Sequence, residues 1–223
     1  MIASNHGRLD FDCFILMGLI LRTRGRVARL MADHLWFRMP VVRRLWTSAG
    51  ALDGTRENAA RVLAGGGLVL TYPGGLREIM GSRFGHERID WEDRTGFAEV
   101  AVAAGVPVIP VVGVGVNNGF AFLTSGRRLG RLLYQGLLRL GPAYSEYGDP
   151  LVIGLVPLPL PYSLAVHLPL PCKVRYVVGE PLYPDTASAD SAADLAARTT
   201  EAMDGLIARY GSQKHRRHQA KPG

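Results

Sequence analysis

Two short aliphatic runs, separated by a segment of helical spacing, constrain most strongly what this chain can fold into. Residues 68–71 follow a run of glycines and are aliphatic up to a final threonine, and residues 106–112 are apolar throughout. Such runs are typical of strands that are buried on both faces of a parallel sheet. Residues 98–104 lie between them, have helical spacing and end at Gly105. This order indicates an α/β fold with a mostly parallel central sheet and helices on both faces.

The other periodic segments predict further elements of the same single domain. We expect helices at residues 14–21, 35–46, 58–64 and 190–210, and strands at residues 26–32, 49–52 and 173–178. Pro40 should kink or restart the second helix, and Asp53 or Thr55 should cap the third. The expected parts of the chain are a core at residues 1–184, a closing amphipathic helix at 185–211 and a basic, disordered tail at 212–223. Only three residues precede the first polar motif, so we expect that the N-terminal strand is truncated.

The chain is basic, and this charge narrows the class of partner. Of its 223 residues 48% are hydrophobic, and the formal net charge of +7 favours an anionic partner. Between residues 22 and 46, arginines are mixed with tryptophan and phenylalanine, as is typical of a surface at a membrane interface. No helix-turn-helix, zinc-finger or RNP motif indicates binding of nucleic acid. We therefore expect a membrane surface as the partner, and no nucleic acid.

Two later segments allow a membrane contact without requiring one. Residues 127–140 predict a basic, leucine-rich helix, which either lies in a membrane interface or covers the sheet with a solvated cationic edge. Residues 151–172 carry no formal charge, and their prolines exclude an uninterrupted membrane-spanning helix. We interpret them as a segment that dips into the interface or lines an acyl groove, with a buried loop over the core as the alternative.

Two kinds of motif that the sequence lacks bear on the cellular compartment of the protein and on metal binding. No secretory signal peptide is present, and Cys13 and Cys172 have neither a disulfide-framework nor a metal-ligand spacing. We expect a reducing compartment, no metal site, and attachment to the cytoplasmic face of a membrane.

A histidine and two carboxylates come directly after the first expected strand. His6 with Asp10 or Asp12 is the minimum set for general-base catalysis on a hydroxyl. Neutral imidazole accepts the proton, and a carboxylate holds the ring and stabilises the imidazolium that forms. Alternatively, one aspartate only caps the next helix and His6 lies on the surface. Asp33 and His34 form a second possible pair, for which a structural histidine is the favoured interpretation.

A glycine-rich turn follows the strand at residues 68–71. It reads Tyr72-Pro73-Gly74-Gly75, with Arg77 and Glu78 close behind. Two glycines let the backbone approach a ligand closely, and the two charged side chains could contact that ligand. Open α/β sheets bind ligands at the carboxyl ends of their strands, so we prefer a binding site to an ordinary turn with a solvated ion pair.

Four features now occur in a recognisable order. They are Asn5-His6 with a following aspartate, Arg56 after a strand, Tyr72-Pro73-Gly74-Gly75 with Arg77-Glu78, and the strand that opens at residues 106–110. This order resembles the glycerolipid acyltransferase superfamily, which includes bacterial lysophosphatidate acyltransferases. The chain is most similar to the branch of type 2 diacylglycerol acyltransferases, phytyl ester synthases and their transmembrane relatives. That closer similarity is carried by His6-Gly7, Ala32-Asp33-His34, Pro73-Gly74-Gly75 with Glu78, and Arg94-Thr95-Gly96-Phe97.

The resemblance implies an acyltransferase-like fold and a membrane-associated enzyme. Such an enzyme moves a fatty acyl group from acyl-CoA, or from acyl carrier protein, to a lipid hydroxyl, and no cofactor beyond this co-substrate is implied. His6 would deprotonate the acceptor hydroxyl with Asp12 as its partner, because their separation matches the shifted spacing of the transmembrane relatives. The implied substrate-binding residues are Asn5, Arg56, Tyr72, Pro73, Gly74, Gly75, Arg77, Glu78 and Arg94.

The residues after Pro73 bear on the identity of the acceptor. Lysophosphatidate enzymes usually carry Pro-Glu-Gly-Thr-Arg in this block, with polar groups suited to a phosphate, whereas this chain has Gly74 and Leu76 there. We therefore expect a neutral glyceride or a long-chain alcohol, with lysophosphatidate or another lysophospholipid as the alternative. Two other classes stay open, namely an esterase or thioesterase, although no Gly-x-Ser-x-Gly motif is present, and a non-catalytic membrane-binding module.

Overall fold

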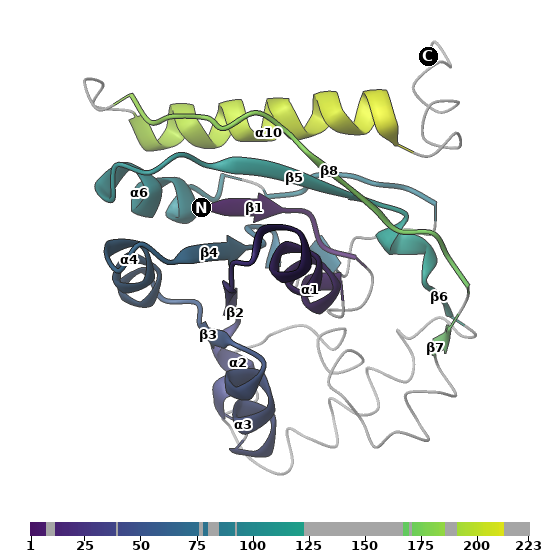
Figure 1. Ribbon diagram of the computed structural model, residues 1–223. Coiled ribbons are helices and arrows are strands. Elements are labelled where there is room, and N and C mark those ends of the chain that lie inside the picture. The colour runs from purple at the N-terminus through teal and green to yellow at the C-terminus, as the bar shows by residue number, and fades with distance from the viewer. Residues whose placement is uncertain are drawn as a thin grey trace, which may run out of the picture.

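The computed structural model describes residues 1–7, 12–38, 40–75, 78–79, 85–91, 93–122, 167–169, 171–185 and 191–211 (Figure 1). At its centre is a sheet of 6 strands. In spatial order these are β3 (Ala51–Asp53), β2 (Ala28–Ala32), β4 (Leu68–Thr71), β1 (Ile2–Ser4), β5 (Ile109–Val114) and β8 (Arg175–Val178). Neighbouring strands from β3 to β5 pair in parallel, and β8 pairs antiparallel with β5. The predicted α/β fold with a mostly parallel sheet is confirmed.

Helices cover both faces of this sheet, as predicted (Figure 1). One face carries α1 (Asp12–Arg24), α2 (His34–Arg38) and α3 (Pro40–Ser48). The other face carries α4 (Arg56–Ala64), α6 (Gly96–Ala103) and α10 (Ser191–Tyr210). Beyond β5 the chain continues into the short 3-10 helix η1 (Val116–Asn118) and into β6 (Phe120–Phe122), which pairs with β7 (His167–Pro169).

The two layers of the core follow from the alternation of side chains along each strand. Ala3 on β1 and Val69 on β4 are buried with side chains of α4, α6 and α10. Their sequence neighbours Ile2 and Leu70 are buried with side chains of α1, α2 and α3. Because both faces of these strands are covered, the positions before the final Ser4 and Thr71 are apolar, and this is why the aliphatic run at residues 68–71 could be recognised in the sequence.

Local signals set several element boundaries where they were expected. The helical pattern at residues 35–46 is interrupted before Pro40, so that α2 ends at Arg38 and α3 begins at the proline. Of the two possible caps of α4, Thr55 is the one used, since its hydroxyl accepts a hydrogen bond from the Asn58 N–H at 3.2 Å.

The prediction that Trp36 and Trp46 lie on the surface is wrong. Their mixture with arginines suggested an interfacial surface, but the two indoles are only 6% and 8% exposed, and their ring centroids stack 5.5 Å apart inside the core. The arginines beside them, Arg38, Arg43 and Arg44, are exposed. The aromatic rings therefore stabilise the fold, and the cations of this segment lie on the surface.

The closing helix expected at residues 190–210 is present as α10, whose Leu195, Met203 and Ile207 are buried against the sheet. Other predicted segments lie outside the described residues, namely the helix at 127–140, most of the uncharged segment 151–172 and the tail at 212–223. In the part of the chain that the structure describes, no helix combines the length and the apolar character needed to cross a membrane.

Candidate functional site

The predicted site residues gather at the edge of the sheet where the parallel strands end. His6 lies just beyond β1, Tyr72 just beyond β4, and Arg56 at the start of the helix that follows β3. Since β1 and β4 are neighbours in the sheet, His6 and Tyr72 meet despite their separation in sequence. Their rings stack with centroids 4.2 Å apart and planes inclined by 19°.

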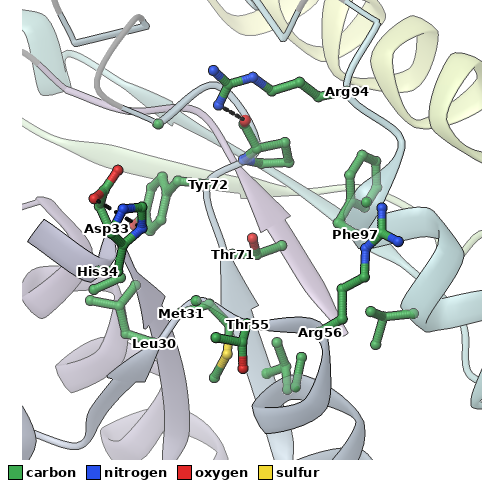
Figure 2. A pocket seen from close by; sticks show the side chains of 18 of the residues that line it. Leu30, Met31, Asp33, His34, Thr55, Arg56, Thr71, Tyr72, Arg94 and Phe97 are labelled. Carbon is green, nitrogen blue, oxygen red and sulfur yellow. Dashed lines mark hydrogen bonds and ion pairs between the residues drawn. The ribbon is translucent and has the colours of Figure 1, made fainter. Parts of the chain in front are cut away.

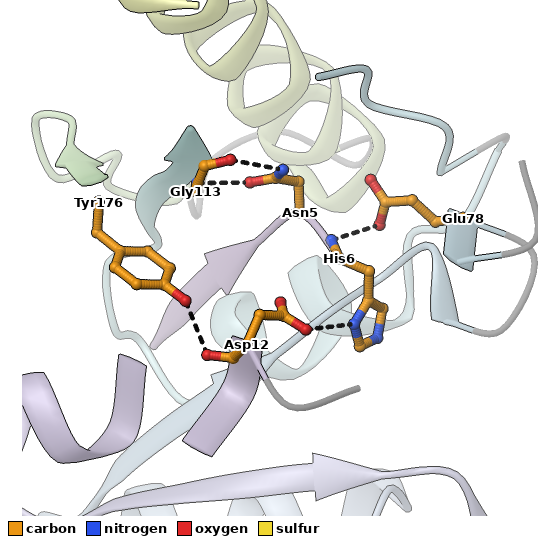
Figure 3. Close-up of polar contacts among 6 residues, drawn as sticks. All are labelled: Asn5, His6, Asp12, Glu78, Gly113 and Tyr176. Carbon is orange, nitrogen blue, oxygen red and sulfur yellow. Dashed lines mark hydrogen bonds and ion pairs between the residues drawn. The ribbon is translucent and has the colours of Figure 1, made fainter. Parts of the chain in front are cut away.

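His6 and Asp12 form a buried pair (Figure 3). His6 Nδ1 lies 3.9 Å from Asp12 Oδ1, and the two side chains are 8% and 5% exposed. This separation is longer than a hydrogen bond, so the contact is electrostatic. Asp12 is also the first residue of α1, where a carboxylate is favourable to the helix dipole. Asp10, the other candidate partner, lies outside the described residues.

Two polar contacts hold the backbone beside this pair. The fully buried Asn5 amide accepts a hydrogen bond from the Gly113 N–H at 2.7 Å and donates one to the Gly113 carbonyl at 3.3 Å, which ties the end of β1 to β5 (Figure 3). The Tyr176 hydroxyl donates to the backbone carbonyl of Asp12 at 2.8 Å. Burial raises the pKa of Tyr176 above its usual range, so this hydroxyl remains a donor. Asn5, expected to contact substrate, is placed where it positions the chain that carries His6.

Glu78 lies on the backbone side of His6. Its Oε2 accepts a hydrogen bond from the His6 N–H at 3.3 Å, and the side chain is 3% exposed. Burial raises the pKa of Glu78 to about 7. A positive charge on His6 and the hydrogen bond from the His6 N–H act to lower this pKa, and the negative charge of Asp12 acts to raise it further. The indole N–H of Trp91 lowers the pKa of Glu78 slightly, although its position does not meet the geometry of a hydrogen bond. This buried carboxyl therefore holds its proton to a higher pH than an exposed glutamate does.

The two glycines after Pro73 have different structural roles. A Cβ on Gly74 would lie 2.5 Å from the Cβ of Glu78, so glycine leaves the room that the glutamate side chain occupies. Gly75 has φ +54°, a conformation that other residues rarely adopt. Arg94 donates to the carbonyl of Pro73 at 3.2 Å and so ties this turn to the segment before α6 (Figure 2). Arg77 lies outside the described residues.

A cleft of about 520 Å³ opens at this edge of the sheet (Figure 2). Six of the predicted site residues line it, namely His6, Arg56, Tyr72, Pro73, Gly75 and Arg94. Its apolar lining includes Leu30, Met31, Trp36, Trp46, Val69, Phe97 and Val100. Arg56 and Arg94 are exposed, and Arg56 Nη2 pairs with Glu99 Oε2 at 2.7 Å. Asn5, Asp12, Gly74 and Glu78 are not among the residues that line the cleft.

Sequence reasoning missed Gly113 and Tyr176. Gly113 is 108 residues from Asn5, and Tyr176 is 164 residues from Asp12, so no local pattern could connect them. It also missed Trp36 and Trp46 as cleft residues, because their spacing with arginines indicated a surface.

Comparison of the sequence with known proteins identifies its family. A sequence model described as diacylglycerol acyltransferase matches residues 9–220, a range that contains Asp12, Arg56 and the turn after β4 and begins just after His6. No solved structure matches the chain.

Curated relatives give the same result. A Homo sapiens protein named DGAT1/2-independent enzyme synthesizing storage lipids is 32% identical over 211 residues, which are 94% of this chain and 57% of that protein. The protein of the same name from Gallus gallus is 30% identical over 94% of this chain and 55% of its own length. An uncharacterised protein of Mycobacterium tuberculosis is 29% identical over 79% of this chain and 49% of its own length. The chain thus spans about half the length of these relatives. Together, the family match and these identities show that the chain belongs to the diacylglycerol acyltransferase family.

Proposed function

We propose that this protein is a membrane-associated O-acyltransferase, which moves a fatty acyl group from acyl-CoA to the hydroxyl of a neutral lipid. The observation that carries the proposal is the buried His6–Asp12 pair, whose histidine lines a cleft with an apolar part where the parallel strands end. An acyl chain needs an apolar lining, and acyl transfer to a hydroxyl needs a base next to that lining.

The chemistry assigns a role to each member of the pair. His6 Nδ1 faces Asp12, so Nε2 is the nitrogen that accepts the proton of the acceptor hydroxyl. The hydroxyl oxygen then bonds to the thioester carbonyl carbon, the carbon–sulfur bond breaks, and the departing thiolate takes the proton back from the imidazolium. The products are an ester and coenzyme A, and no other co-reactant is needed.

Asp12 is suited to stabilise the imidazolium formed in this reaction. Among the described residues, neither of its carboxylate oxygens accepts a hydrogen bond, and the side chain is buried. A buried carboxylate in that position favours a positive charge beside it, because the charge offsets part of its desolvation. The contact between Asp12 and His6 should shorten once the substrate is bound.

The two exposed arginines at the cleft suit an anionic donor. Arg56 and Arg94 offer guanidinium groups that could bind the phosphates of acyl-CoA while the acyl chain enters the apolar part of the cleft. Acyl carrier protein, which also carries a phosphate-linked thioester, is the alternative donor.

A neutral glyceride or a long-chain alcohol is the proposed acceptor. The residue after Pro73 is Gly74, and the nearby carboxylate of Glu78 accepts from the His6 N–H and does not line the cleft. An acceptor phosphate would need several converging donors in addition to those that bind the donor substrate. The name of the mammalian relatives, which refers to storage lipids, also supports a neutral product. Since such acceptors reside in bilayers, we propose that the enzyme works at the cytoplasmic face of a membrane.

The test is acyl transfer by the full chain with labelled acyl-CoA. Diacylglycerol, a long-chain alcohol and lysophosphatidate are supplied at equal concentration in the same micelles, and the lipid products are separated. We expect a labelled neutral ester that is absent with His6→Ala. If lysophosphatidate is preferred by more than about tenfold, roughly 1.4 kcal/mol of transition-state preference, the proposed acceptor is wrong. If no acceptor is acylated, and the thioester is either stable or only hydrolysed, the transferase proposal is wrong.

A further inference from the structure

Five large aliphatic side chains are exposed on α1 and α3, namely Ile15, Leu19, Leu21, Val41 and Leu45, and four of them form two pairs. Ile15 and Leu19 on α1 are 53% and 41% exposed, and Val41 and Leu45 on α3 are 82% and 66% exposed. Each pair is four residues apart and therefore lies on one side of its helix. Both helices thus carry an apolar outward side in addition to the side that packs on the sheet.

The two helices are neighbours on the same face of the sheet (Figure 1). Phe14 of α1 contacts Trp46 of α3, with ring centroids 5.1 Å apart. The residues next to these rings in sequence, Ile15 and Leu45, belong to the exposed set. We call the two pairs, Ile15 with Leu19 and Val41 with Leu45, together with the arginines described next, the α1–α3 face.

The charge around these side chains has a single sign. Arg22 follows Leu19 by three residues and Arg44 follows Val41 by three, which places each on the apolar side of its helix. Other exposed arginines of this region are Arg24, Arg26, Arg29, Arg38 and Arg43. Between residues 13 and 52 the sequence has one acidic residue, Asp33, and that side chain pairs with His34.

We propose that the α1–α3 face is a docking surface for an anionic lipid bilayer. Aliphatic side chains that enter the headgroup region, surrounded by arginines that bind lipid phosphates, are the combination that holds a protein on such a surface. A symmetric contact with a second copy is disfavoured, because it would bring the arginines of both copies together.

The face also adjoins the candidate site. The inner sides of α2 and α3 contribute Trp36 and Trp46 to the cleft, and the outer side of α3 carries Val41 and Leu45. A protein docked through this face would hold its cleft next to the bilayer from which a lipid acceptor comes. This part of the argument rests on the proposed function, whereas the docking itself does not.

The experiment measures binding of the full chain to vesicles of phosphatidylcholine, with and without phosphatidylglycerol, by co-sedimentation. The variant Val41→Ser with Leu45→Ser removes two exposed aliphatic side chains of the face. Its matched control, Val178→Ser with Tyr183→Ser, removes two apolar side chains that are 64% and 67% exposed on and after the edge strand β8. We expect the first variant to lose about tenfold or more in affinity for anionic vesicles, and the control to bind like wild type.

A second variant tests the charge. Arg43→Gln with Arg44→Gln should weaken binding to anionic vesicles severalfold and reduce its salt dependence, while binding to neutral vesicles stays unchanged. Equal binding by wild type and both face variants would overturn the proposal. So would a face variant that dissociates a dimer, seen by light scattering, without any change in vesicle binding.

Activity assays separate this proposal from the proposed function. With substrates dispersed in detergent, the Val41→Ser, Leu45→Ser variant should keep wild-type acyl transfer and lose it only on vesicles. A chain that binds vesicles through this face but transfers no acyl group would leave the docking surface standing and remove the proposed activity. Loss of acyl transfer by the face variant in detergent, with its fold intact by circular dichroism, would assign these residues to the site and contradict a docking role.

Discussion

The described residues include two histidine–aspartate pairs of similar separation and very different surroundings. His6 Nδ1 lies 3.9 Å from Asp12 Oδ1, and His34 Nδ1 lies 3.7 Å from Asp33 Oδ1. The side chains of the first pair are 8% and 5% exposed, and those of the second are 58% and 33% exposed. Separation between the charged atoms therefore does not distinguish the two pairs, and burial does.

Burial changes what such a pair can do. Water screens the exposed pair, so its net electrostatic energy is small, whereas a buried charge pair acts in a lower dielectric. The buried pair is also held by its neighbours, with the His6 ring on Tyr72, the His6 N–H on Glu78 and the preceding Asn5 bonded to β5. The exposed pair is formed by adjacent residues at the start of a helix of 5 residues. Although His6, Asp33 and His34 all line the cleft, it is the first pair that is held by buried neighbours, as a preorganised catalytic group would be.

The largest expected effect is that of His6→Ala. Loss of a general base should lower acyl transfer by on the order of 10²- to 10⁴-fold, measured with labelled acyl-CoA and the preferred acceptor. Because the ring packs on Tyr72, His6→Gln is made in parallel, and circular dichroism checks that both variants are folded. Retention of most of the activity by a folded variant would contradict the assignment of His6 as the base.

The next effect in size is that of Asp12→Asn. The amide cannot stabilise the imidazolium, so the rate of acyl transfer should fall by on the order of 10²-fold. Asp33→Asn is the matched control, and its exposed position predicts a change below about twofold. Asp10→Asn should also do less harm than Asp12→Asn, and the reverse order would move the role of partner to Asp10.

A smaller effect, on stability, is expected at Glu78. Its pKa is raised from an ordinary value of 4.5 to about 7, so the folded chain holds this proton more tightly than the unfolded chain. Stability from this group is therefore complete below pH 4.5 and is lost as the pH rises through about 7. Glu78→Gln keeps an acceptor for the His6 N–H and removes the buried charge. It should stabilise the fold at pH 8, by on the order of 3 kcal/mol at most, and not at pH 5.

Thermal unfolding at the two pH values measures this difference. Glu201→Gln, at an exposed position on α10, is the control and should change stability little at either pH. An equal gain at both pH values would contradict the raised pKa of Glu78, whereas a loss at pH 8 would show that its carboxylate is needed as a charge and not only as an acceptor.

The smallest expected effect is that of His34→Ala. An exposed histidine on a short helix should change acyl transfer by less than about twofold in the same assay, because its ion pair with Asp33 is screened. A loss similar to that of His6→Ala would mean that the exposed pair supplies the reacting histidine, and the comparison between the two pairs would fail.

Much of the fold could be predicted because its signals are local. The strand at residues 68–71 was identified with its correct ends, Thr55 caps α4 as one of two expected residues, and Pro40 separates α2 from α3. Each of these signals depends on a few consecutive residues, whose conformational preferences act in any context. The same holds for the motif His6-Gly7 and for the turn after Pro73, which carried the resemblance to the family.

Local patterns in the sequence were therefore sufficient to predict the type and position of most elements and the set of candidate residues. The tertiary structure decided which of these residues meet, since the pairing of β1 between β4 and β5 brings His6 to Tyr72 and Asn5 to Gly113. It also turned Trp36 and Trp46 inward and buried Glu78 beside His6. Contacts between distant segments depend on how whole elements pack, and burial is a property of that packing, so no local pattern could supply either.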